Sequence, residues 1–191
     1  MSGGIITAPQ PEAVEAGAEV LRDGGNAIDA AVACALVQTA VDPLMCGIAG
    51  FGTMQIHMPG QGVHRFIDFH CRAPAAARPD MWADIVIGEA EDGFGFLLKG
   101  AANEIGYQSI MTPMTLRALA TALERHGTHS LADLLQPAIH YAEEGFLVRP
   151  HVSAFWNEVP GAGRVSHREF VTRFPATRGR ATASLVRLTL R

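Results

Sequence analysis

Residues 24–37 read GGNAIDAAVACALV, which combines the signals for the end of one helix and the start of the next. Gly24 and Gly25 are suited to the left-handed conformation that ends a helix. Asn26 follows, and its side-chain oxygen can accept hydrogen bonds from the first amides of a new helix. The residues after it are apolar on almost every helical face, which is typical of a helix buried on most sides. The stretch therefore predicts a buried, capped helix that ends at Asp42-Pro43.

The segment before this stretch predicts a second helix. Residues 11–23 place apolar side chains at helical spacing, with Gly17 on the same face. A glycine there lets a neighbouring element pack closely. Residues 4–8, GIITA, form a short apolar run before Pro9 and predict a first strand. Asp29 lies inside the buried helix, so we expect a hydrogen-bonded structural carboxylate, because a lone buried charge is costly.

The segment after it predicts a turn and a hairpin. Residues 44–52 are rich in glycine, and residues 53–58 and 63–70 read as two strands joined by the turn at 59–62. Residues 72–110 have no sustained period, so we interpret them as a long surface excursion.

Two further helices follow the excursion. Thr112-Pro113 predicts the start of a helix that reaches residue 127. Ser130 and Asp133 form a capping-box pattern for the next helix, which ends at Gly145. Helices and strands in this order are typical of an α/β or α+β layered fold.

Composition and charge exclude several classes of protein. The chain is 48% hydrophobic and 18% charged, which is globular, and no window would span a bilayer. No signal peptide is visible, and three cysteines are an odd number without metal-like spacing, so we expect a cytoplasmic protein. Residues 1–163 hold 8 Arg/Lys against 18 Asp/Glu, whereas residues 164–191 hold 7 Arg against Glu169 alone.

Three segments together carry a resemblance to a known family. GGNAIDAA (24–31), IDFHCRAPAAARPDM (67–81) and HGTHSLADLLQPAIHYAEEGFLV (126–148) resemble, in this order, the large subunit of the gamma-glutamyltransferase family. The resemblance covers roughly residues 3–155. It implies part of an Ntn-hydrolase αββα sandwich and a precursor that cleaves itself into two subunits. The N-terminal threonine of the small subunit would then attack a gamma-glutamyl amide of the glutathione type.

The nucleophile is expected to lie outside this chain. Thr128-His129 is similar to the family's Thr-His run, but Ser130 reads as a helix cap, which favours a turn over a nucleophile. We therefore expect residues 1–160 to be an N-terminal fragment, inactive alone, with no catalytic residue of its own. Two alternatives are a related Ntn amidohydrolase or acylase with another amide substrate, and a non-catalytic degenerate subunit.

The resemblance also implies a substrate contact. The family places an arginine for the substrate carboxylate just after the strand at Ile67 to Phe69, where this chain has His70. Arg72 lies two residues on and can substitute for it, and the alternative is that Arg72 is a surface arginine. We interpret Gly47 to Gly52 as a structural turn. His64, His70 and Cys71 lack further converging ligands, so neither a metal nor an organic cofactor is expected.

Two further expectations concern the partners of the chain and its C-terminal tail. The predicted partners are the missing C-terminal part of the precursor and a small amide substrate, without nucleic acid or membrane. Apolar surface left open should make the fragment self-associate. We interpret residues 161–191 as a truncated or frameshifted reading of a longer gene, and a genuine basic interaction tail is the alternative.

Overall fold

The structure is a computed structural model that describes residues 4–43, 45–91 and 93–152. The interpretation of residues 161–191 therefore lies outside the described residues. The elements, in chain order, are α1 (Pro11–Arg22), α2 (Ala27–Val41), β1 (Thr53–Met58), η1 (Pro59–Gln61), β2 (Val63–Asp68), η2 (Ala83–Ile85), β3 (Val86–Glu89), β4 (Phe96–Leu98), η3 (Lys99–Ala101), η4 (Tyr107–Ser109), α3 (Thr115–His126) and α4 (Leu131–Glu144). Among the described residues, none of the helices meets the length and hydropathy that a membrane span requires.

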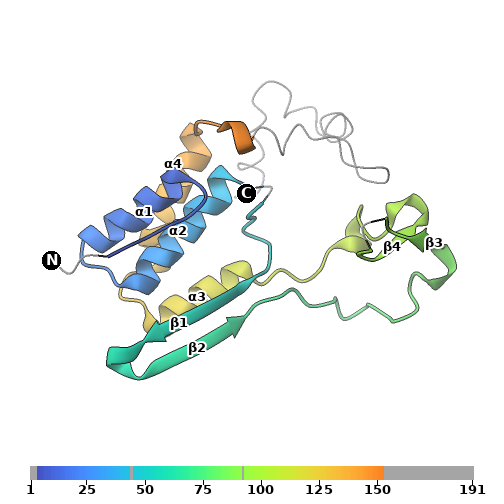
Figure 1. Cartoon of the computed structure of the whole chain (residues 1–191), viewed down its shortest axis with the longest axis horizontal. Helices are drawn as coiled ribbons and strands as arrows, with labels where there is room; N and C mark the ends of the chain where they lie inside the picture. Colours follow the sequence, from blue (N-terminus) through green and yellow to red (C-terminus); the bar gives the residue numbers. More distant parts are fainter. Residues whose placement is uncertain (1–3, 44, 92, 153–191) are drawn as a thin grey trace.

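Helix α2 is the centre of the fold. It packs against α1, α3 and α4, and Figure 1 shows it inside the group of helices. Its side chains are buried over most of its length, including Val32, Leu36 and Val37 with no exposed surface. The all-round apolar pattern that predicted a buried helix is thus confirmed.

Gly17 sets how closely α1 and α2 approach. A Cβ at this position would lie 2.8 Å from the carbonyl oxygen of Ala30 and 3.3 Å from the Cβ of Cys34. Ile6, from the segment before α1, fills the remaining space over the same glycine. The predicted role of Gly17 as a point of close packing is confirmed.

Helix α2 begins with the predicted cap. Asn26 Oδ1 accepts hydrogen bonds from the amides of Ile28 (2.7 Å) and Asp29 (3.1 Å), and Asp29 Oδ2 accepts one from the amide of Asn26 (2.9 Å). Asn26 also donates through Nδ2 to the carbonyl of His126, at the end of α3 (2.7 Å). The cap of one helix therefore fixes the end of another, 100 residues later.

Strands β1 and β2 form an antiparallel hairpin, with Thr53 opposite Asp68 and Met58 opposite Val63. One face packs on the helical core through Met54, Ile56, Met58, Val63 and Ile67. The other face, with Phe66, is exposed in the described part of the chain. Figure 1 shows the hairpin alongside α3, with the excursion extending away from the helices.

Three expectations need correction. Residues 4–8 form no strand, because no neighbouring segment pairs with them among the described residues. Helix α3 begins at Thr115 rather than at Thr112-Pro113, with Met114 at the N-cap and no side-chain cap. The segment interpreted as a long surface excursion contains the short antiparallel pair β3–β4, which was not predicted.

Candidate functional site

The glycine-rich turn at residues 47–52 lies between the end of β2 and the start of α3. The carbonyl of Gly50 accepts hydrogen bonds from the amides of Met114 (3.1 Å) and Thr115 (3.3 Å), and the carbonyl of Gly52 accepts one from Phe69 (3.1 Å). A Cβ at Gly52 would lie 3.0 Å from the Phe69 ring. These contacts support the interpretation of a structural turn and fix the backbone beside the predicted substrate residues.

His70 is oriented by two neighbours. Asp68 Oδ1 accepts hydrogen bonds from both the amide and the Nδ1 of His70, each at 3.0 Å. Both hydrogen bonds lower the pKa of the Asp68 carboxyl, and the bond from the His70 amide has the larger effect. The Phe51 ring, from the turn, lies 5.4 Å from the imidazole, centroid to centroid. His70 is thus held at the surface with one ring nitrogen already engaged.

Arg72 lies at the base of the excursion. It forms an isolated antiparallel bridge with Thr112, whose amide donates to the Arg72 carbonyl (2.9 Å). This bridge closes the excursion just before α3, and the Arg72 side chain is exposed. Strand β2 ends at Asp68, so strand alternation does not set the relative directions of His70 and Arg72.

The two predicted substrate residues lie in the segment that leads from β2 to the excursion. His70, Cys71 and Arg72 follow Phe69, the first residue after β2, and the Cys71 thiol donates to the Gly50 carbonyl (3.6 Å). Sequence reasoning missed Asp68 and Phe51 as neighbours of His70. An aspartate two residues before His70 was a local signal for the first contact, whereas the contact with Phe51 depends on the turn.

Thr128 is a structural anchor in this chain. Its hydroxyl donates to Asp29 Oδ2 (2.6 Å) and its amide to Asp29 Oδ1 (2.8 Å). The amide of His129 also donates to Asp29 Oδ1 (3.1 Å), and its Nδ1 lies 3.4 Å from Oδ2. The interpretation of this segment as a turn, with Ser130 accepting from the Asp133 amide as a helix cap (3.1 Å), agrees with these contacts.

Asp29 is the acceptor at the centre of this network and has no exposed surface. Burial alone would raise its pKa, but the hydrogen bonds from Thr128, Asn26 and His129 outweigh burial and lower it from 3.8 to about 2. The expectation of a hydrogen-bonded structural carboxylate is confirmed.

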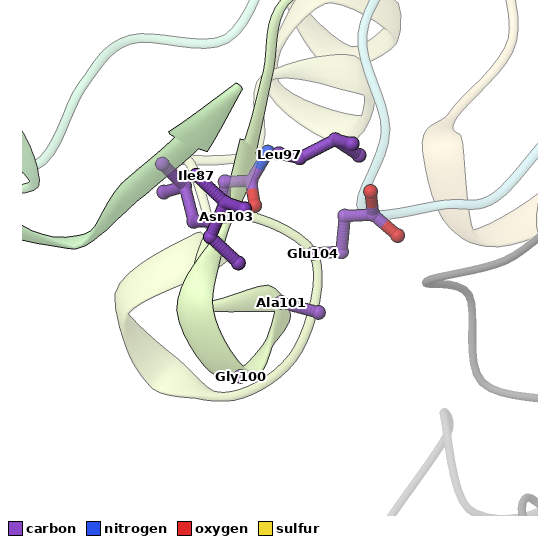
Figure 2. Close-up of a pocket in the computed structure, with 7 residues that line it drawn as sticks. Ile87, Leu97, Gly100, Ala101, Asn103 and Glu104 are labelled. Carbon is purple, nitrogen blue, oxygen red and sulfur yellow. The ribbon is translucent and has the colours of Figure 1, made fainter. Parts of the chain in front are cut away.

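A separate hollow of about 290 Å³ lies on the excursion and includes neither His70 nor Arg72. Figure 2 shows it between β3–β4 and the turns that follow. The residues that line it are Ile87, Leu97, Leu98, Gly100, Ala101, Asn103 and Glu104. In the described ranges no three His, Cys, Asp or Glu side chains are grouped so that they could hold a metal ion.

Known proteins match this chain over most of its length. The family model for gamma-glutamyltranspeptidase covers residues 13–181. An acylase ACY 1 proenzyme from Pseudomonas sp. (strain V22) is 40% identical over 154 residues, which are 80% of this chain and 26% of that protein. A glutathione hydrolase proenzyme from Bacillus subtilis (strain 168) is 40% identical over 143 residues, 75% of this chain and 23% of that protein.

A solved structure has the same fold. The crystal structure of Helicobacter pylori gamma-glutamyltranspeptidase superposes with a TM-score of 0.70 at 31% identity, over 82% of this chain and 42% of that chain. The described residues thus have the mixed α+β architecture of an Ntn-hydrolase relative. The chain spans about a quarter of the length of the curated relatives it matches.

Proposed function

Because the chain belongs to the gamma-glutamyltranspeptidase family, we propose that it is the N-terminal part of the large subunit of an amide-cleaving enzyme. The enzyme hydrolyses or transfers the gamma-glutamyl group of glutathione-like amides. The glutathione hydrolase proenzyme at 40% identity supports this substrate class. The small fraction of that protein which the chain covers supports a longer, self-cleaving precursor.

The proposed reaction uses a threonine exposed by self-cleavage downstream of these residues. Its hydroxyl oxygen attacks the amide carbonyl, and its free α-amine takes the hydroxyl proton and passes it to the departing amine. The resulting ester is then opened by water or by a second amine. We do not assign this role to Thr128, because its backbone amide and its hydroxyl both donate to the buried carboxylate of Asp29.

Within this chain, we assign the substrate carboxylate to Arg72 in preference to His70. The guanidinium of Arg72 is exposed at the edge of the site, and its fork geometry matches a carboxylate. His70 has its Nδ1 bound to Asp68 and its ring beside Phe51. The contact between Asp68 and His70 is the observation that carries the choice, since a carboxylate beside the imidazole disfavours a second one.

A related acylase is the second candidate. Two acylase ACY 1 proenzymes are 40% and 39% identical to this chain, and the Bacillus subtilis glutathione hydrolase proenzyme is 40% identical. The histidine at position 70, where the resemblance implies an arginine, supports the same alternative. Such an enzyme would cleave an amide whose acyl group lacks the glutamyl α-carboxylate.

Hydrolysis of a chromogenic gamma-glutamyl anilide tests the proposal. The 191-residue chain and a longer polypeptide that continues through the downstream reading frame are assayed together. We expect self-cleavage and activity in the longer polypeptide alone. Self-cleavage with activity only on non-glutamyl amides would favour the acylase. Absence of both would favour a non-catalytic subunit.

The role of Arg72 is tested in the longer polypeptide. Arg72→Ala should raise KM for the glutamyl substrate about 10–100-fold, because a charge-assisted hydrogen bond of about 1.5–3 kcal/mol is lost. Arg78→Ala is the matched control, since Arg78 is exposed and pairs with Asp80 on the excursion. Equal kinetics for both variants would contradict the assignment.

A further inference from the structure

Three backbone irregularities border the hollow of about 290 Å³ on the excursion. The register of β3 on β4 passes from Val86 opposite Leu98 to Gly88 opposite Leu97, so Ile87 is the extra residue of a bulge. Gly100 and Ala101 both have left-handed backbone, with φ of 70° and 51°. Bulges redirect side chains, and strained conformations gather at binding sites, where their surroundings hold them in place.

Ala101 is the costly member of this set. It is the one non-glycine residue with a positive φ in the described part of the chain, and its Cβ makes this conformation unfavourable. Its carbonyl accepts hydrogen bonds from the amides of Glu104 and Ile105, each at 2.9 Å. The left-handed turn thus places Glu104 on the border of the hollow.

The walls of the hollow are mainly apolar. Leu98 is nearly buried, at 7% exposed, whereas Leu97 and Ile87 are 37% and 70% exposed. A hydrocarbon group in the hollow would remove this apolar surface from water. Sites for drug-sized ligands have volumes of about 300–1,000 Å³, so the volume of the hollow favours a smaller molecule.

The polar lining consists of two side chains, Asn103 and Glu104, and Figure 2 shows both beside the apolar residues. Nδ2 of Asn103 donates to the carbonyl of Phe96 on β4 (3.0 Å), which orients the amide and leaves its oxygen as an acceptor. The Glu104 carboxylate is exposed and forms no ion pair with any described residue. A ligand that donates hydrogen bonds is therefore favoured.

The charge of the surrounding segment favours a cation. Residues 79–111 contain one basic residue, Lys99, and six acidic ones: Asp80, Asp84, Glu89, Glu91, Asp92 and Glu104. Asp80 pairs with Arg78, outside this range. Lys99 does not line the hollow and does not pair with Glu104, so it leaves this carboxylate available. A segment with this excess of negative charge attracts cations and repels anions.

An apolar amine satisfies all of these conditions. We propose that the hollow binds a small apolar primary amine, with its hydrocarbon part against Ile87, Leu97 and Leu98 and its ammonium group at Glu104. The ammonium has three donors, which suit a carboxylate and an amide oxygen. A carboxylic acid would be repelled, and a neutral apolar molecule would leave Glu104 without a donor. The site is independent of the proposed amide cleavage, so its test needs no enzymatic activity.

The test is a titration of the 191-residue chain with n-hexylamine, followed through the NMR signals of its isoleucine and leucine methyl groups. The signals of Ile87, Leu97 and Leu98 should shift saturably. Ile5 and Leu147, which are 97% and 73% exposed and lie outside the excursion, should not respond. Equal shifts at Ile5 and Leu147 would indicate general adsorption to apolar surface and would overturn the proposal.

Two matched compounds separate the contribution of charge from that of apolar contact. Hexan-1-ol has the same chain length without the charge, and its Kd should be about tenfold higher or more, because a charge-assisted hydrogen bond is lost. Hexanoate should bind more weakly still. Equal affinity for the three compounds would refute the role of Glu104.

Two variants locate the charge. Glu104→Gln should remove the preference for hexylamine over hexanol, and the exposed position makes a loss of folding unexpected. Glu89→Gln changes an exposed acid of β3 that does not line the hollow, and it should keep the preference. An unchanged preference in Glu104→Gln would refute the site.

The source of the amine is tested with a model of a lysine side chain. Nα-acetyl-lysine amide presents the same ammonium on a shorter hydrocarbon chain with a polar backbone, so it should bind more weakly than hexylamine. Tighter binding of the lysine compound would assign the hollow to a polypeptide partner and overturn the proposal of a small-molecule site.

Discussion

At the scale of single residues, the carboxylate of Asp29 joins two distant parts of the chain. It accepts from Asn26 at the start of α2 and from Thr128 and His129, 99 and 100 residues later. Gly127 packs tightly on it, because a Cβ there would lie 2.8 Å from Asp29 Oδ1. The segment GGNAIDAA and the segment that begins at His126 are therefore two halves of one structural unit.

Because of the Asp29 carboxylate, we expect the free energy of unfolding to depend on pH. The pKa of Asp29 is lowered from 3.8 to about 2 on folding, so the unfolded chain binds its proton more tightly. The lowered pKa of Asp29 corresponds to about 2 kcal/mol of stabilisation of the folded state. This stabilisation is complete at pH values above the pKa of Asp29 in the unfolded chain, and it is lost as the pH falls through about 2. Urea unfolding at a series of acidic pH values should show this loss.

Asp29→Asn should remove that acid-dependent component and lower the unfolding free energy at neutral pH by about 1.5–3 kcal/mol, because charge-assisted hydrogen bonds become neutral ones. Asp23→Asn, at an exposed position, is the control and should change little. An Asp29→Asn variant with the wild-type pH profile would show that the network does not stabilise the fold.

At the scale of elements, the packing of α1 on α2 depends on the absence of a side chain at Gly17. Gly17→Ala should separate the helices or displace Ile6, since a Cβ would lie 2.8 Å from the Ala30 carbonyl. We expect a loss of about 1–3 kcal/mol of unfolding free energy, as for other overpacked sites. Thermal or urea unfolding measures it.

Gly60→Ala, in the turn between β1 and β2, is the matched control, because a Cβ there meets no atom within 4 Å. The two variants make the same chemical change in different surroundings. Equal stability of both would mean that α1 can shift without cost, contrary to the close-packed interface described above.

At the scale of the whole molecule, the excursion exposes its large apolar side chains, whereas the helical core buries them. Large apolar side chains are exposed along the excursion, with Tyr107 at 93% and Ile87 at 70%. The others are Val86, Phe94, Phe96, Leu97 and Ile110. Apolar surface of this kind is typical of a segment that another polypeptide covers, here the proposed remainder of the precursor.

The same surface predicts self-association of the 191-residue chain. Sedimentation velocity should show oligomers that increase with concentration, and replacing both Ile87 and Tyr107 by Ser should reduce them. Leu147→Ser, at an exposed apolar position outside the excursion (73%), is the control and should reduce them less. A wild-type chain that stays monomeric at every concentration would contradict the prediction.

The sequence alone determined the local elements. The cap at Asn26, the all-round apolar pattern of α2 and the turn between β1 and β2 are encoded within a few residues, so their positions could be read directly. The resemblance placed His70 and Arg72 at the end of a strand, and the structure has β2 end two residues before His70.

The contacts between these elements, in contrast, depend on how the chain packs in three dimensions. Residues 4–8 have the composition of a strand, but no strand in the described part of the chain pairs with them, and a strand is stable only with a partner. The hydrogen bonds of Asp29 with Thr128, and of Gln10 with Asp42, join residues that no local pattern relates. Hydrogen bonding depends on distance and direction between groups, and for groups far apart in the chain these are set only when the helices pack.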